Sequence, residues 1–543
     1  MLSFKLYFLG GGNEKQWTVL RHNGPFFPPE YEPHKIPVIV NNNNIVLNPE
    51  AEEYATIYAK YLDTAYINNN TFKKNFWKDF KKYIKNENIK SLEEMDFSLI
   101  KNYLDNEKEK KKKLTKDEKE KITNKQNNIE EPYKYCIIDG SQQKVGNYKI
   151  EPPGIFIGRG SHPKIGKIKK RIQPEDVTLN LDKESKVPET NVKNHKWGEI
   201  IHDNTVIWLA SWKDDITGKT KYVFTSLESF FKSKSDEEKF DLARKLKKKI
   251  GSIRETYEKE LNSEDLKTKQ LATALYFIDN LALRVGGKKD SKEEADTVGV
   301  TSLRVEHLLL LEDNTVKLDF LGKDSVRFCK KINVHKQVYI NLQQFCKNKP
   351  KKEELFDLIN SSTLNEYLDS FLKGLTAKVW RTYNASFTFQ KELEKLVSSK
   401  KLDGFTEQNE RLNYLIAIFN QANTEVALLC NHQKAVTTNL DNVINKIDNQ
   451  IKELKKKKET YKNNKNTEKT KKVENKIKLL KIKKESKIKM KNVSLGTSKQ
   501  NYIDPRIIFA FIKKYDIPPE KLFTTKLLSR FQWANKVDAD YKF

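Results

Sequence analysis

The segment LATALYFIDNLALRVGG, residues 271–287, predicts a buried helix in the middle of this chain. Apolar residues three and four apart line one helical face, and Gly286–Gly287 ends the pattern. Arg284 is therefore expected in the last turn, facing a glycine-rich corner. An arginine in such a place is usually a surface capping residue. The alternative is a guanidinium fork that binds phosphate.

Long helices are predicted around this segment, over residues 230–435, with one interruption near 314–340. The interruption contains VKLDFLGKDSVRF, residues 316–328, in which apolar residues alternate before LGKDS. The alternation predicts a β-hairpin with Lys323 at or near its tip. Turn lysines are commonly just solvated, and the functional alternative is a flexible ammonium that enters a groove.

Three further segments of this half place a basic or reactive side chain in a distinctive context. Arg381 lies in LTAKVWRTYNAS, among aromatic and amide residues. A strongly apolar helix is predicted to end at Asn431–His432, where the imidazole could simply cap the helix dipole. Tyr502 lies in SLGTSKQNYIDPRI, a polar stretch that predicts a non-core position for its ring.

Each of these side chains has an ordinary structural explanation, but the set is coherent for phosphoryl transfer. Two guanidinium groups can neutralise the non-bridging oxygens of a pentacovalent phosphorane, and a histidine can donate a further hydrogen bond. A lysine can protonate the leaving 5′ oxygen, and a tyrosine can attack and store the bond as a phosphodiester. The candidate catalytic residues are Arg284, Lys323, Arg381, His432 and Tyr502.

The first half of the chain has a different pattern. Residues 17–31, WTVLRHNGPFFPPEY, predict an extended segment packed on a domain surface, and Asn41–Asn44 predict a loop. Residues 49–104 have helical spacing, and residues 106–131 are so charged that a solvated helix or a disordered connector is expected. Short β-rich runs over 134–229, separated by Gly, Pro and Asp, predict an antiparallel β region.

Residues 441–491 predict two antiparallel helices coated with lysine. The first helix has one apolar face, the Asn463–Asn466 run breaks the pattern, and the second helix resumes it. The residues expected on these apolar faces are Val443, Ile447, Ile451, Leu454, Val473, Ile477, Leu480 and Ile488.

The chain carries 102 Lys and Arg residues against 74 Asp and Glu residues, a net charge of +28. Such a field favours a polyanion, most commonly a nucleic acid, although lysine-rich solvated tails or AT-rich codons would also raise the lysine content. The 37 % of hydrophobic residues is enough to bury several cores. The four widely spaced cysteines predict buried free thiols in a reducing compartment. They are Cys136, Cys329, Cys346 and Cys430.

Other classes of function are disfavoured. No apolar run is long enough to span a bilayer, and Lys5 interrupts an apolar start that lacks a cleavage site, so neither a membrane protein nor a secreted one is expected. The nearest approach to a P-loop is Gly218–Lys219–Thr220, which lacks the first glycine and is better explained as a hairpin turn. No carboxylate cluster is typical of a Mg²⁺ site. A reaction that requires neither ATP nor a metal is therefore expected.

The motifs resemble those of the eukaryotic DNA topoisomerase I (type IB) family, segment after segment. The resemblance covers nearly the whole chain from Trp17 to Phe543, and none of the five catalytic residues is substituted. It implies a 3′-phosphotyrosyl intermediate at Tyr502, rotation and religation that relax both signs of supercoil, and no requirement for ATP or metal. The matching stretches are ALYFIDNLALR, EADTVGVTSLRVEH, DFLGKDSVRF, LTAKVWRTYNAS, CNHQKA, LGTSKQNYIDPRI, EPPGIFIGRGSHPKIG and RHNGPFFPPEYEP.

The resemblance also implies contact residues. In relatives an arginine often occupies the place of Ile157, so one phosphate contact is expected to be lost here. Tips near Lys164 and Glu293 are expected to meet as lips that part for DNA entry. The implied DNA contacts are Arg159, Lys164, Lys221, Tyr222, Lys239, Gly286, Lys288, Lys289, Thr297, Thr376, Ala377 and Lys378. Positions matching contacts of camptothecin-type intercalating poisons are Arg159, Asp324 and Asn501.

The expected fold is an α+β multidomain clamp around double-stranded DNA, with a mainly helical catalytic lobe related to tyrosine recombinases. One chain contains the complete catalytic set, so a functional monomer is expected. The family's long charged N-terminal region is expected to be missing, since only some 16 residues precede Trp17 in this sequence. Nuclear localisation is expected, with the lysine-rich hairpin as a hypothetical import signal. The expected parts are an N-terminal segment (1–36), a helical cap (37–115), a β-rich DNA-binding part (116–229), a catalytic core (230–435), a helical linker (436–491) and a C-terminal domain (492–543) that carries Tyr502.

Two other functions fit part of the sequence. A tyrosine recombinase uses almost the same five residues, but that class commonly has a histidine three residues before its second arginine, where this chain has Lys378. A non-catalytic DNA-binding or chromatin scaffold would explain the charge, yet it does not need all five catalytic residues. A DNA relaxation assay separates the three functions.

Overall fold

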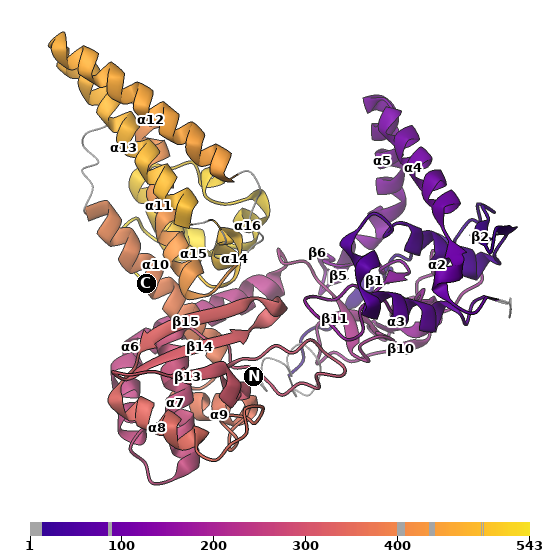
Figure 1. Cartoon of the computed structure of the whole chain (residues 1–543), viewed down its shortest axis with the longest axis horizontal. Helices are drawn as coiled ribbons and strands as arrows, with labels where there is room; N and C mark the ends of the chain where they lie inside the picture. Colours follow the sequence, from indigo (N-terminus) through magenta and orange to yellow (C-terminus); the bar gives the residue numbers. More distant parts are fainter. Residues whose placement is uncertain (1–13, 85–88, 399–407, 434–439, 490, 492) are drawn as a thin grey trace. The chain divides into compact units, whose positions relative to one another are not determined.

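The computed structural model describes residues 14–84, 89–398, 408–433, 440–489, 491 and 493–543. The chain folds as two compact units that mix helix and sheet (Figure 1). An N-terminal unit runs to Lys232 and also contains the later segment Lys289–Asp296. A C-terminal unit comprises Ser233–Lys288 and the chain from Thr297 onward. The six-part division expected from the sequence stays a prediction.

The β region of the N-terminal unit contains two small sheets, with strand orders β1-β5-β6 and β10-β9-β11-β12. Most pairs are antiparallel, as predicted, but β9 and β10 run parallel. The prediction is wrong at that edge because the long connection over residues 181–198 returns the chain to the same end of the sheet. The strands are β1 (Leu20–His22), β5 (Tyr135–Ile138), β6 (Ser141–Lys144), β9 (Val177–Asn180), β10 (Glu199–Ile201), β11 (Trp208–Lys213) and β12 (Thr220–Phe224).

The segment at residues 17–31 packs against this β region, as predicted, and several of its side chains enter the core. Trp17, Leu20 and Phe27 are buried, and the Trp17 indole donates a hydrogen bond to the carbonyl of Val206 at 2.7 Å. Large aromatic side chains supply much of the apolar area that a small sheet needs to cover itself. The near miss to a P-loop is the turn between β11 and β12, as predicted.

The helical part of the N-terminal unit surrounds a second core. Phe72, Phe76 and Phe80, four residues apart on α3, are fully buried and follow the spacing of one helix face. The predicted loop is a tight turn in which Asn41 and Asn42 have positive φ, while Asn43 and Asn44 belong to a strand. The elements are β2 (Val38–Val40), β3 (Asn43–Ile45), α2 (Pro49–Ala59), α3 (Asn70–Phe80), β4 (Met95–Asp96), β7 (Gly154–Ile155) and β8 (Ile168–Lys169).

The charged stretch at residues 106–131 is helical and solvated, which confirms the first of its two alternatives. It forms the end of α4 (Ser98–Lys113) and the whole of α5 (Lys116–Glu130), and nearly all its side chains are exposed. Thr115 begins α5 with a capping box, since its hydroxyl accepts from the Glu118 amide and the Glu118 carboxylate accepts from Thr115.

The C-terminal unit places its helices and one three-stranded sheet around a single large core. The predicted hairpin near residues 314–340 is present as β14 and β15, and a third strand, β13, pairs with β14. The elements are α6 (Phe230–Glu260), α7 (Leu266–Leu281), β13 (Leu308–Leu310), β14 (Thr315–Leu321), β15 (Arg327–Asn333), α8 (Lys336–Cys346), α9 (Ser361–Phe371), α10 (Ala377–Ser398) and α11 (Gln408–Leu429).

The lysine-coated hairpin is formed by α12 (Leu440–Asn463) and α13 (Thr467–Lys489), which lie side by side in Figure 1. Ile451, Val473 and Ile477 form a small separate core between the two helices, as predicted. Ile488 is exposed, so its predicted packing is wrong. At this end α13 contacts α11 through Lys489, which donates to Glu425 at 2.8 Å.

A compact terminal piece follows, with α14 (Leu495–Asn501), α15 (Pro505–Tyr515) and α16 (Thr525–Arg530). One face of α15 enters the core of the C-terminal unit, and Asp504 caps the helix by accepting from the Arg506 amide at 2.9 Å. All four cysteines are free thiols, but Cys329 is exposed and Cys346 half-buried, so the prediction of burial holds only for Cys136 and Cys430. Cys329 lies on the open face of the sheet, where strand alternation points it outward.

Candidate active site

Arg284 lies beyond the end of its helix, not in the last turn as predicted. The helix α7 ends at Leu281 because Ala282 adopts a left-handed conformation with φ 50°. Side chains of α10 satisfy the carbonyls at this helix end. Asn384 donates to Ile278 and Asp279 at 3.1 and 2.9 Å, and Arg381 donates to Ala282. Arg284 is therefore carried by a segment that belongs to no helix or strand.

Two glycines hold this segment against the chain that follows it. The carbonyl of Arg284 accepts from the Val300 amide at 2.9 Å. A Cβ added to Gly286 would lie 2.7 Å from the backbone of Gly299, and one added to Gly299 would lie 2.4 Å from the backbone of Gly286. Only glycine permits this close approach. The position of Arg284 therefore depends on both glycines.

Lys323 is at the tip of the hairpin between β14 and β15, as the alternation of apolar residues predicts. It begins a short turn, Lys323–Ser325, in which Asp324 and Ser325 have φ of 66° and 58°. Below the tip, Arg327 makes a bidentate ion pair with Asp319 across the two strands, at 2.7 and 2.6 Å. The guanidinium holds the pKa of Asp319 at about 2, so the pair remains charged at neutral pH.

Arg381 is buried on α10, with 5 % of its surface exposed. Its guanidinium donates to the carbonyls of Ala282 and Cys430, which come from the ends of α7 and α11. Its Nε is buried and has no hydrogen-bond partner among the residues that the structure describes. A buried charge with an unsatisfied donor is costly unless a ligand supplies an acceptor, which makes Arg381 suited to an anion.

His432 lies after the end of α11, close to the predicted place, and faces two arginines. Burial, followed by the charges of Arg381 and Arg284, lowers the pKa of its imidazole to about 3. The ring is therefore neutral at physiological pH. Its Nδ1 is 2.9 Å from the hydroxyl of Ser498, and its Nε2 is 3.5 Å from the Arg381 guanidinium.

The chain on either side of His432 is attached to the hairpin that carries Lys323. The side-chain amides of Asn431 and Gln433 both donate to the carbonyl of Arg327, at 3.2 and 3.0 Å. These two bonds connect the histidine to the lysine through the first residue of β15. Sequence reasoning missed both amides, because nothing local marks them as partners of Arg327.

Tyr502 is buried in the main core with 5 % of its surface exposed, so its predicted non-core position is wrong. Its ring stacks on His432 with centroids 5.4 Å apart and planes inclined by 28°, and the Arg381 guanidinium lies 5.1 Å from the ring centroid. Both of these partners are far from Tyr502 in the sequence, and the ring belongs to the large core of this unit. Its backbone carbonyl accepts from the hydroxyl of Ser386 at 3.1 Å.

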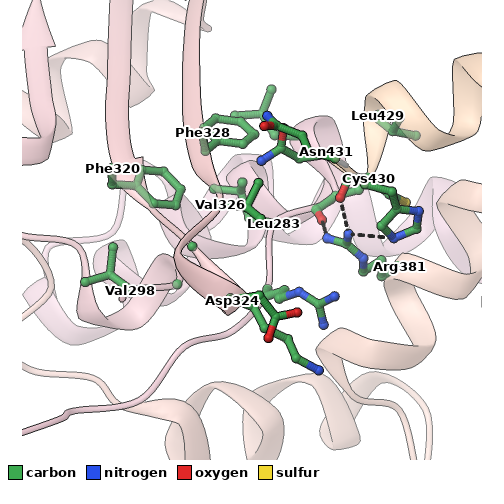
Figure 2. Close-up of a pocket in the computed structure, with 18 of the residues that line it drawn as sticks. Leu283, Val298, Phe320, Asp324, Val326, Phe328, Arg381, Leu429, Cys430 and Asn431 are labelled. Carbon is green, nitrogen blue, oxygen red and sulfur yellow. Dashed lines mark hydrogen bonds between the residues drawn. The ribbon is translucent and has the colours of Figure 1, made fainter. Parts of the chain in front are cut away.

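Four of the five predicted catalytic residues line one pocket of about 130 Å³, and the fifth, Tyr502, packs against two of them. Figure 2 shows Arg381 pointing into this region beside Cys430, with Asp324 at the hairpin turn on the other side. The pocket is smaller than the roughly 300–1,000 Å³ typical of drug-sized ligands. Its two guanidiniums, one ammonium and one neutral imidazole suit a small anion such as a phosphodiester.

The predicted DNA contacts of the N-terminal unit lie at charged surface positions. Lys164 pairs with Glu293 within this unit, and Lys221 pairs with Asp214 and Glu151 at 2.9 and 3.0 Å. The exposed members are Arg159 and Lys289, and Tyr222 is half-buried beside Trp208 and Phe224.

The remaining predicted contacts belong to the C-terminal unit. Thr376, Ala377 and Lys378 lie at the start of α10, where backbone amides favour a phosphate. Lys239 is buried and donates to the carbonyl of Asn501 at 3.0 Å. Lys288 is exposed, Gly286 is partly exposed and Thr297 is buried. Contact with DNA or with a poison stays a prediction for every one of these residues, Asp324 and Asn501 included.

Two structural searches bear on other classes of function. No group of three or more His, Cys, Asp or Glu residues that could hold a metal ion occurs in the described part of the chain. Within the same ranges, every helix is too short or too polar to cross a membrane.

Comparison with known protein families gives matches along the whole chain. Residues 15–225 match the model "Eukaryotic DNA topoisomerase I, DNA binding fragment", and residues 228–465 match "Eukaryotic DNA topoisomerase I, catalytic core". Residues 474–543 match "C-terminal topoisomerase domain".

Individual relatives agree with these matches. DNA topoisomerase 1 beta of Arabidopsis thaliana is 42 % identical and covers 98 % of this chain, which spans 60 % of that protein. DNA topoisomerase 1 of Caenorhabditis elegans is 43 % identical, with 97 % of this chain and 68 % of the relative covered. The Homo sapiens protein of that name is 40 % identical, with 97 % and 72 % covered. The chain thus spans between 60 % and 72 % of the length of these relatives.

Proposed function

This chain belongs to the eukaryotic DNA topoisomerase I family, and from that premise we propose that it relaxes supercoiled DNA as an ATP-independent type IB topoisomerase. The observation that carries the proposal is the pocket. Four side chains from separate parts of the sequence line it, and Tyr502 packs directly against Arg381 and His432. A non-catalytic DNA-binding scaffold has no need of this arrangement.

Cleavage begins when the Tyr502 hydroxyl gives its proton to solvent water and its oxygen attacks the phosphorus of one phosphodiester. The bond from phosphorus to the tyrosine oxygen forms, and the bond to the 5′ oxygen breaks. Lys323 protonates the departing 5′ oxygen from the hairpin tip, where its flexible side chain enters the pocket. The product is a 3′-phosphotyrosyl bond and a free 5′ hydroxyl. In religation this hydroxyl attacks the phosphorus and releases Tyr502.

The transition state gathers negative charge on the non-bridging phosphate oxygens. Arg284 and Arg381 neutralise it, and the Nε of Arg381 gains the acceptor that it lacks in the DNA-free chain. His432 contributes a hydrogen bond without adding charge, since its imidazole is neutral at physiological pH. In this proposal the chain's own cations supply all the electrostatic stabilisation, so neither ATP nor a metal is required.

The clamp proposed for this family member encloses duplex DNA through contacts with phosphates of both strands, with little base specificity. Between cleavage and religation the downstream DNA rotates about the intact strand, and the basic hairpin α12–α13 restrains the rotation. The catalytic part is related to that of tyrosine recombinases, and one chain acts alone. The same contacts would support relaxation during replication and transcription and trapping by camptothecin-type poisons.

The decisive test is plasmid relaxation in EDTA without ATP, on negatively and positively supercoiled DNA. We expect the wild type to relax both signs and Tyr502→Phe to relax neither while binding DNA as tightly. Tyr515→Phe is the matched control, since Tyr515 lies in α15 outside the pocket, and it should relax DNA normally. A wild type that binds plasmid and relaxes neither sign would overturn the proposal in favour of a DNA-binding scaffold. Joining of two separate duplexes at the wild-type cleavage site would instead indicate a recombinase.

Nuclear localisation is part of the proposal, with the lysine-rich hairpin as the import signal. A fluorescent fusion of this chain should accumulate in the nucleus. Deletion of residues 441–491 should abolish that accumulation, and undiminished nuclear signal in the deletion variant would exclude the hairpin as the signal.

A further inference from the structure

Ser498 contacts two of the five catalytic residues, although sequence reasoning did not single it out. It lies in α14, four residues before Tyr502, and its side chain is completely buried. Its hydroxyl is 2.9 Å from Nδ1 of His432. Its carbonyl accepts from the amides of Tyr502 and Ile503, at 2.9 and 3.0 Å. A single residue thus joins the imidazole to the backbone of the nucleophile.

The contacts of the imidazole define its tautomer in the DNA-free chain. The Arg381 guanidinium, 3.5 Å from Nε2, is only a donor, so Nε2 accepts. In a neutral ring the proton is then on Nδ1, and Nδ1–H donates to the Ser498 hydroxyl. To donate to a phosphate oxygen, the ring must instead carry its proton on Nε2.

A serine hydroxyl is suited to both tautomers, because it accepts from Nδ1–H in one and donates to bare Nδ1 in the other. When a phosphate draws the Arg381 guanidinium away from Nε2, the ring loses its proton at Nδ1 and gains one at Nε2 through solvent. Rotation of the Ser498 hydroxyl then keeps Nδ1 hydrogen-bonded. The buried site offers Nδ1 no other hydrogen-bond partner from the described residues.

We propose that Ser498 is a positioning residue that holds the His432 ring in the pocket and supports the tautomer whose Nε2–H faces the phosphate. This inference rests on the proposed function, because the phosphate is that of the cleaved DNA strand. Ser498 itself touches neither the DNA nor the reacting atoms. It acts through His432, so the effect of substituting Ser498 should depend on the presence of His432. A purely structural role in the packing of α14 would not show this dependence.

The first test is a double-mutant cycle on single-turnover cleavage at saturating DNA. Ser498→Ala should lower the cleavage rate constant about tenfold, the worth of roughly one hydrogen bond, with unchanged DNA affinity. In a His432→Ala background the same change should have no further effect. Equal losses in both backgrounds would overturn the proposal, since Ser498 would then act without His432. Ser498→Thr, which keeps the hydroxyl, should recover most of the rate.

The matched control is Ser494→Ala in the same segment. The backbone amide of Ser494 donates to the His432 carbonyl at 2.8 Å and survives the change, while its side chain makes no capping bond. Cleavage by this variant should equal that of the wild type, and a loss as large as that of Ser498→Ala would overturn the assignment to the hydroxyl.

The second test does not depend on activity. In the DNA-free chain with nitrogen-15-labelled histidine, the ring signals of His432, assigned by their loss in His432→Asn, should be those of the Nδ1–H tautomer. In Ser498→Ala the Nδ1 signal should shift because its hydrogen bond is lost, while Arg381 at Nε2 keeps the ring proton on Nδ1. Identical ring signals in the two chains would overturn the proposal even if the enzyme is active. Inactive wild type with the expected signals would instead refute the proposed function and leave the contact between Ser498 and His432 established.

Discussion

At the scale of single residues, His432 gives the chain a pH-dependent stability. Its pKa is about 3 in the folded chain against an ordinary value of about 6.5. The neutral ring's contribution is fully present above pH 6.5. Below that pH the unfolded chain binds a proton that the folded chain does not bind. The free energy of unfolding should therefore fall as pH drops from 6.5 toward 3, by up to about 1.4 kcal/mol per pH unit.

The measurement is denaturant unfolding of the DNA-free chain between pH 7 and pH 5, for wild type and His432→Asn. We expect the wild type to lose more unfolding free energy over this range, because the variant lacks the titrating ring. The comparison uses the slope of the unfolding free energy against pH in each protein. A loss of stability that the substitution causes equally at both pH values does not change this slope. Parallel slopes would mean that the folded pocket accepts a proton on His432.

Ser386 has a second positioning role, at the backbone of the nucleophile. Its buried hydroxyl donates to the carbonyl of Tyr502 at 3.1 Å and accepts from the amide of Asp504 at 3.0 Å. Ser386→Ala leaves both groups buried without that partner, so it should cost about 1–3 kcal/mol of unfolding free energy and slow cleavage. Ser252→Ala, at an exposed position of α6, should change neither quantity. A stable Ser386→Ala variant with normal cleavage would show that other contacts suffice to hold Tyr502.

The identity of the catalytic residues could be predicted from sequence, but the burial of Tyr502 could not. The letters around it, SKQNYIDP, are polar, and only partners that are distant in sequence bury the ring. Ser386 and Ser498 were missed for the same reason, since their hydrogen bonds join segments far apart in the chain. Local patterns carry little information about such contacts.

At the scale of elements, the close approach of Gly286 and Gly299 fixes the segment that carries Arg284. Gly299→Ala would place a Cβ 2.4 Å from the backbone of Gly286, and backbone atoms cannot yield as a flexible side chain does. We expect the free energy of unfolding to fall by several kcal/mol and any remaining folded enzyme to cleave slowly, because Arg284 moves.

Gly251→Ala is the opposite case and the control for this prediction. Gly251 lies inside α6 with open space around the added Cβ, so alanine should stabilise the chain by about 0.5–1 kcal/mol. Thermal unfolding and single-turnover cleavage of both variants test the pair. Normal stability and cleavage in Gly299→Ala would contradict the role given to the glycine contact.

Two elements of the site illustrate what local sequence determines. The hairpin of Lys323 could be predicted because strand alternation and the turn lie within thirteen residues, 316–328. The end of α7 could not, because side chains of α10 cap its last carbonyls and Ala282 takes a left-handed conformation normally left to glycine. In the sequence the apolar spacing continues past the observed end of α7, so the prediction placed Arg284 inside the helix.

The hairpin α12–α13 has its own small core and contacts α11 by ion pairs, so its length can be changed separately from the pocket. Removing residues 455–461 and 466–472 takes about two turns from each helix, keeps their phase and retains the core residues Ile451, Val473 and Ile477. We expect cleavage to be preserved and processivity, religation rate or poison sensitivity to change, because less basic surface restrains the rotating DNA. Relaxation time courses at several salt concentrations, with and without camptothecin, measure this. No change in any of the three would remove the hairpin's proposed control role.

At the scale of the whole molecule, some of the 102 Lys and Arg side chains are paired with carboxylates of the chain before DNA binds, although the net charge stays +28. Lys164 and Lys221, both implied as DNA contacts by family resemblance, pair with carboxylates of the N-terminal unit. Composition alone indicated a polyanion, and the resemblance supplied an order of six parts that stays a prediction. The resemblance also implied that tips near Lys164 and Glu293 meet, and the segment Lys289–Asp296 clusters with the N-terminal unit, where Lys164 pairs with Glu293. Composition could not indicate this placement, because ion pairs between distant parts of the chain contribute to it.

The pairs made by that segment test the proposed clamp. Lys164 pairs with Glu293 and Lys219 with Glu294, so four charged side chains hold Lys289–Asp296 in the N-terminal unit although its chain neighbours belong to the C-terminal unit. If these pairs close the clamp, Glu293→Lys should repel Lys164 and favour opening.

Once loaded at low salt on covalently closed circular DNA, the wild type should resist a high-salt wash, and Glu293→Lys should dissociate several-fold faster. Lys164→Glu combined with Glu293→Lys restores the pair with reversed charges and should restore salt resistance. Linear DNA is a second control. Every variant should dissociate from it, because a closed protein clamp can slide off the DNA ends. Equal salt resistance of the wild type and Glu293→Lys on circular DNA would show that the pair does not close the clamp. Failure of the double variant to recover would assign the effect of Glu293→Lys to a neighbour other than Lys164, or would show that Lys164 is itself needed for contact with phosphate.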